Sequence, residues 1–325
     1  MLEVRHDRPA LALAPMEGVT DAPMRQLMSE RGAFSYCVTE FLRVSQDVPP
    51  RHLFLRHIPE LGGGARTVAG LPVQVQLLGG DPEKMARAAQ VAVEAGATAI
   101  DLNFGCPAPT VNRHDGGATL LKHPERLRAI VKAVRQALPL AVPVSAKLRL
   151  GWDDPGAIHG NAERAAEGGA AWITIHGRTR TQGYRPPAFW GPIGEVRRRL
   201  GIPVVANGEI WTVEDLLRCR DETGCQHFML GRGALADPSL STRAAQALGL
   251  PVQTPDPGEV AWLPLLQRFA ALSASFSDRP LYPVGRIKQW ARMSHLRFPN
   301  RWYEAIKTLR TLDEILAAVA AHGVR

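Results

Sequence analysis

Residues 203–215 read Pro-Val-Val-Ala-Asn-Gly-Glu-Ile-Trp-Thr-Val-Glu-Asp. The apolar, β-branched run at 203–206 predicts a short buried strand, and the Asn-Gly pair after it predicts a turn. Thr212, with two acidic residues close behind it, is typical of a helix start. This stretch therefore predicts one unit in which a strand is followed by a helix.

The same alternation recurs through the first three-quarters of the chain, with strand centres about 25–45 residues apart, the size of a βα unit. The predicted strands are Leu11–Ala14, Tyr36–Thr39, Val73–Leu77, Thr98–Leu102, Val144–Leu148, Trp172–His176, Pro203–Ala206 and His227–Leu230. Eight such units predict a closed (β/α)8 TIM barrel. An open doubly wound sheet is the competing fold, but no Gly-x-Gly-x-x-Gly follows the first strand.

The pattern changes after the eighth unit. Pro251–Gly258 is rich in proline and predicts a linker. Four helices are expected beyond it, at Glu259–Phe276, Val284–Arg297, Trp302–Arg310 and Asp313–His322. The sequence thus predicts a barrel domain at residues 1–250 and a small helical domain at residues 258–325.

Composition excludes several classes of protein. The chain has 325 residues, of which 45% are hydrophobic and 22% charged, as expected of a globular protein. Four cysteines are too few for a disulfide scaffold, and the spacing of Cys219 and Cys225 fits no common zinc site. No apolar run reaches the ~18 residues of a membrane span, and no signal peptide is recognisable. We expect a cytoplasmic protein without metal.

Positive charge is concentrated near the C-terminus. The net charge is +8, and residues 279–310 contain eight Lys or Arg against one acid, Glu304. On a helix, Lys288, Arg292 and His295 share one face, while Ile287, Trp290 and Ala291 can pack inward. The segment predicts either an RNA-binding surface or a solvated face.

Uncommon residues follow the predicted strands, where barrel enzymes place their active sites. The loop Asp101-Leu-Asn-Phe-Gly-Cys-Pro107 carries Cys106, a candidate general acid or nucleophile. Gln76 ends another strand, and its amide could pair with the imide edge of a flavin or pyrimidine. Lys147, His176 and Arg178 together favour an anionic ligand.

Two short glycine-rich turns, at residues 206–210 and 230–234, follow the last two predicted strands. Loops at this place in a barrel commonly bind phosphate through backbone N–H groups. A phosphate there and a flat ring over the barrel mouth together describe FMN.

With these residues in place, the chain resembles the tRNA-dihydrouridine synthases, from about Leu11 to about Leu309. The family motifs are Ala14-Pro-Met-Glu-Gly18, Gln76-Leu-Leu-Gly79, Asp101–Pro107, Lys147-Leu-Arg-Leu-Gly151, His176-Gly-Arg178, Ala206-Asn-Gly-Glu209 and Gly231-Arg-Gly233. Details are most similar to the C subfamily, in Thr39-Glu-Phe-Leu-Arg43, Gly116-Gly-Ala-Thr-Leu-Leu121, Gln182-Gly-Tyr184, Asn207-Gly-Glu-Ile-Trp211 and Arg286-Ile-Lys-Gln-Trp290.

The resemblance implies that FMN, reduced by NADPH, gives hydride to C6 of a D-loop uridine at position 16, while Cys106 delivers the proton to C5. The implied FMN contacts are Pro15, Met16, Glu17, Gln76, Lys147, His176, Asn207, Gly208, Glu209, Gly231 and Arg232. The implied uridine or tRNA contacts are Arg43, Asn103, Arg178, Tyr184, Arg286, Lys288, Arg292 and Lys307. A monomer is expected to bind the D-loop and elbow of tRNA.

Three other functions remain open at this point. A flavin barrel acting on a free pyrimidine, such as a dihydroorotate dehydrogenase, would share the chemistry but would not need the basic helices. An RNA-binding protein without turnover would be colourless. A flavin-free aldolase would use Lys147 as a Schiff base, but would not need Gln76 and Cys106.

Overall fold

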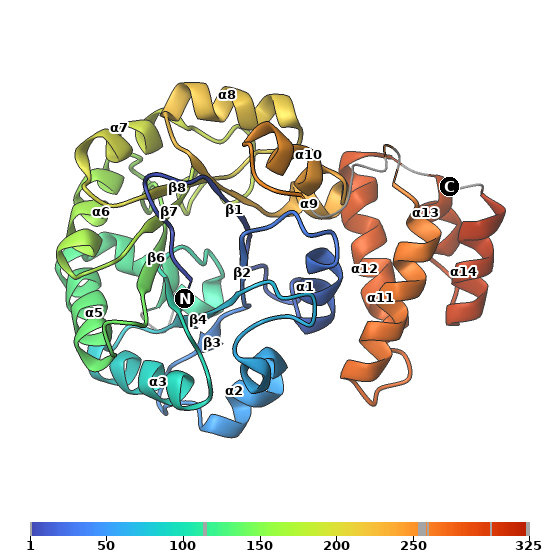
Figure 1. Ribbon diagram of the computed structural model, residues 1–325, viewed down its shortest axis with the longest axis horizontal. Helices are drawn as coiled ribbons and strands as arrows, with labels where there is room; N and C mark the ends of the chain where they lie inside the picture. The colour runs from blue at the N-terminus through green and yellow to red at the C-terminus, as the bar shows by residue number, and fades with distance from the viewer. Residues whose placement is uncertain (1, 113–115, 253–257, 259, 300, 323–325) are drawn as a thin grey trace.

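The computed structural model describes residues 2–112, 116–252, 258, 260–299 and 301–322. Parallel strands form a closed barrel, and a group of helices lies beside it (Figure 1). The strand order is β2-β1-β9-β8-β7-β6-β5-β4-β3, and pairing of β2 with β4 closes the ring. The predicted TIM barrel is confirmed, and the open-sheet alternative is wrong.

All eight predicted strands are present, with ends that differ by two residues at most. They are β1 (Ala10–Leu13), β2 (Tyr36–Val38), β4 (Val73–Leu78), β5 (Ile100–Asn103), β6 (Val144–Arg149), β7 (Ile173–His176), β8 (Val204–Asn207) and β9 (His227–Leu230). The additional strand β3 (Leu42–Arg43) pairs with β4 outside the ring. Two residues are too few to show a hydrophobic period, so this strand was not predicted.

Helices surround the barrel. They are α1 (Ala22–Ser29), α2 (Arg51–His57), α3 (Pro82–Glu94), α4 (Pro109–Asn112), α5 (Pro124–Ala137), α6 (Ala157–Glu167), α7 (Gly191–Arg199), α8 (Val213–Thr223), α9 (Arg232–Ala236) and α10 (Leu240–Ala247), with 3-10 turns at Pro59–Gly63 and Gly117–Lys122. The Thr212 hydroxyl accepts a hydrogen bond from Asp215 N, as its place in the sequence predicts. Among the described helices, none combines the length and apolarity needed to cross a bilayer.

The four predicted C-terminal helices are also present, as α11 (Trp262–Phe276), α12 (Tyr282–Arg297), α13 (Arg301–Ile306) and α14 (Leu312–Ala321). The predicted linker includes residues 253–257, which lie outside the described part of the chain. The hydrophobic core continues from the barrel into these helices.

A tryptophan cluster marks this junction. The ring centres of Trp262 and Trp290 are 5.2 Å apart, and those of Trp262 and Trp302 are 5.3 Å apart. Trp290 Nε1 donates to the carbonyl of Leu235 in α9, at 2.8 Å. The inward packing expected of Ile287, Trp290 and Ala291 is confirmed, since all three are buried. The helical part is therefore held against the end of the barrel wall.

Candidate functional site

The carboxyl ends of the barrel strands enclose a cavity of about 570 Å³. Every residue that the sequence predicted as catalytic or cofactor-binding lines it, and so do Asn103 and Tyr184. Met293 of α12 also lines the cavity, so the helical part contributes to its wall. The cavity joins residues that are more than two hundred positions apart in the sequence, because parallel strands end at the same edge of the barrel.

An amide network forms one wall. Asn103 Nδ2 donates to Gln76 Oε1 at 2.8 Å, and Gln76 Nε2 donates to the buried Asp101 carboxylate at 2.7 Å. Asn103 Oδ1 accepts the N–H groups of Gly105 and Cys106, both at 2.9 Å. The predicted substrate contact Asn103 is thus occupied in shaping the Cys106 loop. Gln76 keeps one N–H and one oxygen lone pair for a ligand.

Cys106 is half-buried in this loop. Its carbonyl accepts the N–H of Ala118 at 3.1 Å. Gly117, the residue before Ala118, has a φ of 61°. Burial raises the pKa of the Cys106 thiol, and the nearby Glu17 carboxylate raises it further. The thiol is therefore neutral near pH 7, which suits a proton donor better than a thiolate nucleophile.

Cations gather at the ends of the neighbouring strands β6 and β7, where Lys147 pairs in register with Asn103. Lys147 Nζ donates to Asn207 Oδ1 at 3.2 Å. Burial and the charge of Arg149 lower the pKa of Lys147 to about 8, and burial with several nearby cations puts the pKa of His176 well below its usual range. Burial and the charges of Arg232 and Arg149 lower the pKa of Arg178 to about 10. Burial is the largest cause of each shift, but the nearby cations contribute to all three, so positive charge is concentrated here and favours an anionic ligand.

The two glycine-rich turns meet beside these cations. Gly208 has a φ of 109°, and a Cβ there would lie 2.5 Å from His176 Cδ2. A Cβ on Gly233 would lie 2.2 Å from the carbonyl oxygen of Ile210. Glu209 is a non-glycine residue with a φ of 59°, and it forms an ion pair with the buried Arg178. Such compact turns leave backbone accessible next to positive charge, and this donor set fits the phosphate and ring of FMN.

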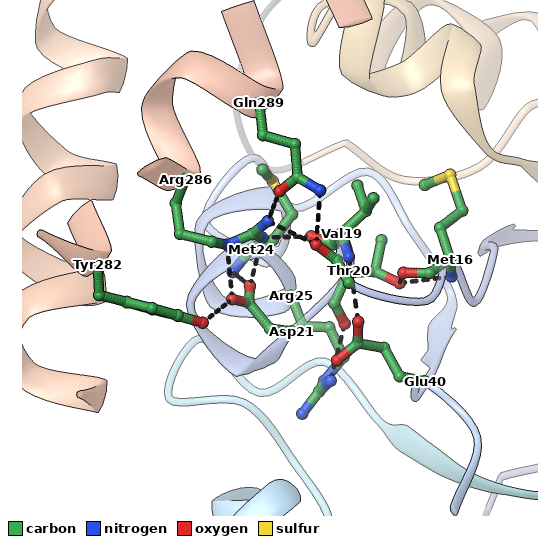
Figure 2. Close-up of polar contacts among 11 residues, drawn as sticks. Met16, Val19, Thr20, Asp21, Met24, Arg25, Glu40, Tyr282, Arg286 and Gln289 are labelled. Carbon is green, nitrogen blue, oxygen red and sulfur yellow. Dashed lines mark hydrogen bonds and ion pairs between the residues drawn. The ribbon is translucent and has the colours of Figure 1, made fainter. Parts of the chain in front are cut away.

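The remaining predicted tRNA contacts do not line the cavity. Arg286 is buried, and Figure 2 shows its guanidinium on the loop between β1 and α1. It bonds both Asp21 oxygens, at 2.8 and 2.9 Å, and the carbonyls of Gly18 and Val19, at 2.7 and 2.6 Å. A bond to Gln289 uses the last of the five N–H donors. Arg286 therefore holds a cavity loop, and its contact with tRNA stays a prediction.

The other predicted basic residues have varied surroundings. Lys288 Nζ donates to the carbonyls of Lys307 and Leu309. The exposed Lys307 forms an ion pair with Glu304, and Arg292 is exposed on α12. Arg43 donates to the Thr110 carbonyl at 3.3 Å.

Several cavity residues were missed. Glu40 accepts the N–H of Val19 at 3.0 Å (Figure 2), and burial together with the charges of Glu17 and Asp21 raises its pKa to about 7. Arg149 and Trp211 also line the cavity. The sequence carried a usable sign for Glu40 and Arg149, because each is a charged residue at or just after the end of a predicted strand.

Comparison with known proteins agrees with this geometry. A sequence profile of the dihydrouridine synthase (Dus) family matches residues 12–322. A tRNA-dihydrouridine(16) synthase of Pseudomonas putida is 46% identical over 89% of this chain and 89% of its own length. Enzymes with the same name from Neisseria meningitidis (42% identity, 94% of this chain, 92% of its own) and Haemophilus influenzae (42%, 93% and 96%) are similar. The chain belongs to the dihydrouridine synthase family.

Proposed function

We propose that this protein is a flavin-dependent oxidoreductase that reduces the C5–C6 bond of a D-loop uridine in tRNA, at position 16. The observation that carries the proposal is one cavity that holds a neutral, half-buried thiol together with a cluster of cations. The names of the similar proteins support tRNA as the substrate and position 16 as its target.

The cavity residues divide into groups with different tasks. FMN, once reduced by NADPH, would supply the hydride that adds to C6 of uracil. Lys147 would stabilise negative charge on the cofactor ring, and the remaining N–H of Gln76 would bind its imide edge. Asn207, Gly208 and Arg232 would hold the phosphate, with Met16 against the ring.

Cys106 would complete the reaction on the uracil. Addition of hydride at C6 moves electron density toward C5 and the adjacent carbonyl, so C5 needs a proton. The thiol of Cys106 is protonated near pH 7, and Asn103 holds its loop in place through two N–H bonds. Cys106 therefore serves as the general acid, and Tyr184 at the cavity edge can contact the uracil ring.

The target uridine must leave the tRNA fold to enter the cavity, and unstacking it requires a few kcal/mol of free energy. Phosphate contacts outside the cavity must offset this unfavourable free energy. The exposed Arg292 is next in sequence to Met293, the α12 residue that completes the cavity wall, and the exposed Lys307 directly follows α13. One chain therefore carries both the cavity and a basic surface, which is why a monomer suffices.

The test is mass-spectrometric mapping of dihydrouridine in an unmodified tRNA transcript incubated with protein, FMN and NADPH. We expect dihydrouridine at position 16, and Cys106→Ala should retain bound flavin and its reduction by NADPH but lose at least about 100-fold in uridine reduction. Another modified position would overturn the choice of target only. A yellow protein that oxidises NADPH and reduces free pyrimidines but no tRNA would overturn the proposal.

A further inference from the structure

Five planar side chains form a row that begins at the cavity and ends at the last turn of α12. The guanidinium carbon of Arg232 lies 5.0 Å from the ring centre of Tyr184 and 5.1 Å from that of Trp211. That of Arg297 lies 5.4 Å from the Trp211 ring and 5.3 Å from the Phe298 ring. Aromatic rings and guanidinium planes thus alternate from Tyr184 to Phe298, and we call these five residues the Arg–aromatic row.

The row connects the two parts of the molecule. Tyr184, Trp211 and Arg232 line the cavity. Arg297 is the last residue of α12 and Phe298 caps that helix. One end of the row therefore lies in the cavity wall, and the other lies at the end of α12 in the basic helical part.

Packing alone does not account for the row. Tyr184 is 55% exposed and Phe298 is 39% exposed, although both are large aromatic residues. The helix α12 is already held by the buried Arg286 and by Trp290 and Ser294, which donate to carbonyls of α9. Cation–π contacts at exposed sites add little to such an interface. Tyr184 also has Arg149 against its ring, at 5.1 Å, so the outer end of the row, at Arg297 and Phe298, is the part most open to a ligand.

The chemistry of the row favours single-stranded nucleic acid. Arg232 and Arg297 are cationic, and the two carboxylates that contact Trp211 are already bonded. Glu209 accepts from Trp211 Nε1 at 2.8 Å and pairs with Arg178, whereas Asp215 accepts from the backbone N–H groups of Trp211 and Thr212. Unpaired bases stack on aromatic rings and guanidinium planes, and phosphates bind the outer guanidinium N–H groups.

We propose that the Arg–aromatic row is a stacking platform for the unpaired nucleotides that adjoin the base in the cavity. This inference rests on the proposed function, because the occupant is the RNA strand that carries the target uridine. Phe298 at the exposed outer end would stack on a neighbouring base, and Arg297, held against Trp211, would back that stack and bind a phosphate, so that the target base is presented to the cavity.

Substitutions at the outer end of the row separate stacking from charge. Arg297→Lys keeps the positive charge but removes the plane, and Phe298→Ala removes a ring. We expect each to raise the KM for an unmodified tRNA transcript by about 5- to 100-fold, with kcat and bound FMN unchanged. Arg198→Ala, which removes an exposed charge from α7 on the side of the barrel away from the helical part (Figure 1), should change KM less than twofold.

A second readout detects the stack directly. In a transcript with 2-aminopurine next to the target uridine, binding of the wild-type protein should quench the fluorescence, and Phe298→Ala should reduce that quenching. With an abasic residue at the same place, wild type and Phe298→Ala should bind equally. Wild-type affinity in Arg297→Lys and Phe298→Ala would overturn the platform. A wild-type protein that forms no dihydrouridine would instead overturn the proposed function.

Discussion

Lys147 illustrates how one residue's surroundings set its chemistry. Burial beside Arg149 lowers its pKa to about 8 in the ligand-free protein. An anionic ligand binds better when Lys147 is protonated, so binding above pH 8 requires uptake of a proton. We expect the Kd for FMN to rise by up to about tenfold per pH unit above pH 8, as measured by flavin fluorescence with the apoprotein. Lys147→Met should bind weakly and without that slope, and an equal slope in this variant would assign it to another group.

Burial of the Glu40 carboxylate makes the stability of the protein depend on pH. Its pKa is about 7 in the folded protein against an ordinary value of 4.5, so the folded state binds a proton more tightly than the unfolded state. Stability therefore falls as the pH rises from 4.5 to 7, by at most about 3 kcal/mol. Glu40→Gln keeps an oxygen for the Val19 N–H and removes this charge.

We expect Glu40→Gln to raise the free energy of unfolding at pH 8 by about 1–3 kcal/mol and to have little effect near pH 4.5, as measured by urea denaturation. Glu163→Gln, at an exposed position on α6, should have no effect at either pH. If Glu40→Gln and wild type had the same free energy of unfolding at pH 8, ionisation of Glu40 would not destabilise the folded protein.

At the scale of elements, α12 is joined to the loop after β1 through one buried ion pair. Arg286→Met leaves Asp21 without a cation and Asp21→Asn leaves the guanidinium without an anion, and each should destabilise the protein by about 3–5 kcal/mol. The double variant should lose less than the sum, because neither partner is then left charged. Arg268→Ala breaks the half-exposed pair with Glu30 between α11 and the end of α1, and should lose under about 1 kcal/mol. Additive losses in the double variant would rule out direct coupling.

The elements themselves were largely predictable, because hydrophobic runs and helix caps are local. The exceptions are instructive. The structure begins α12 at Tyr282, two residues before the prediction, because Pro283 is tolerated in a first helical turn. It ends α13 at Ile306, whereas the prediction continued to Arg310. The direction of Arg286 could not be predicted, because its partner Asp21 is 265 residues away and only the fold brings them together.

On the scale of the whole molecule, the cavity residues could be found from the sequence because parallel strands end together. Cys106, Gln76 and Lys147 were recognised one strand at a time and lie in one cavity. Contacts between the barrel and the helical part were not recognisable in this way. Trp211 and Arg297 lie on different parts of the chain, and no local pattern indicates that they stack.

The tryptophan cluster at the junction of the two parts has a spectroscopic consequence. Closely packed indole rings in fixed orientations produce near-ultraviolet ellipticity, which disappears when the packing is lost. Trp262, Trp290 and Trp302 come from three different helices, and Trp290 is also bonded to the barrel through Leu235. Separation of the helices from the barrel would therefore change the circular dichroism of the protein even if the barrel stayed folded. Near-ultraviolet circular dichroism therefore reports whether the helices that complete the cavity wall remain packed against the barrel.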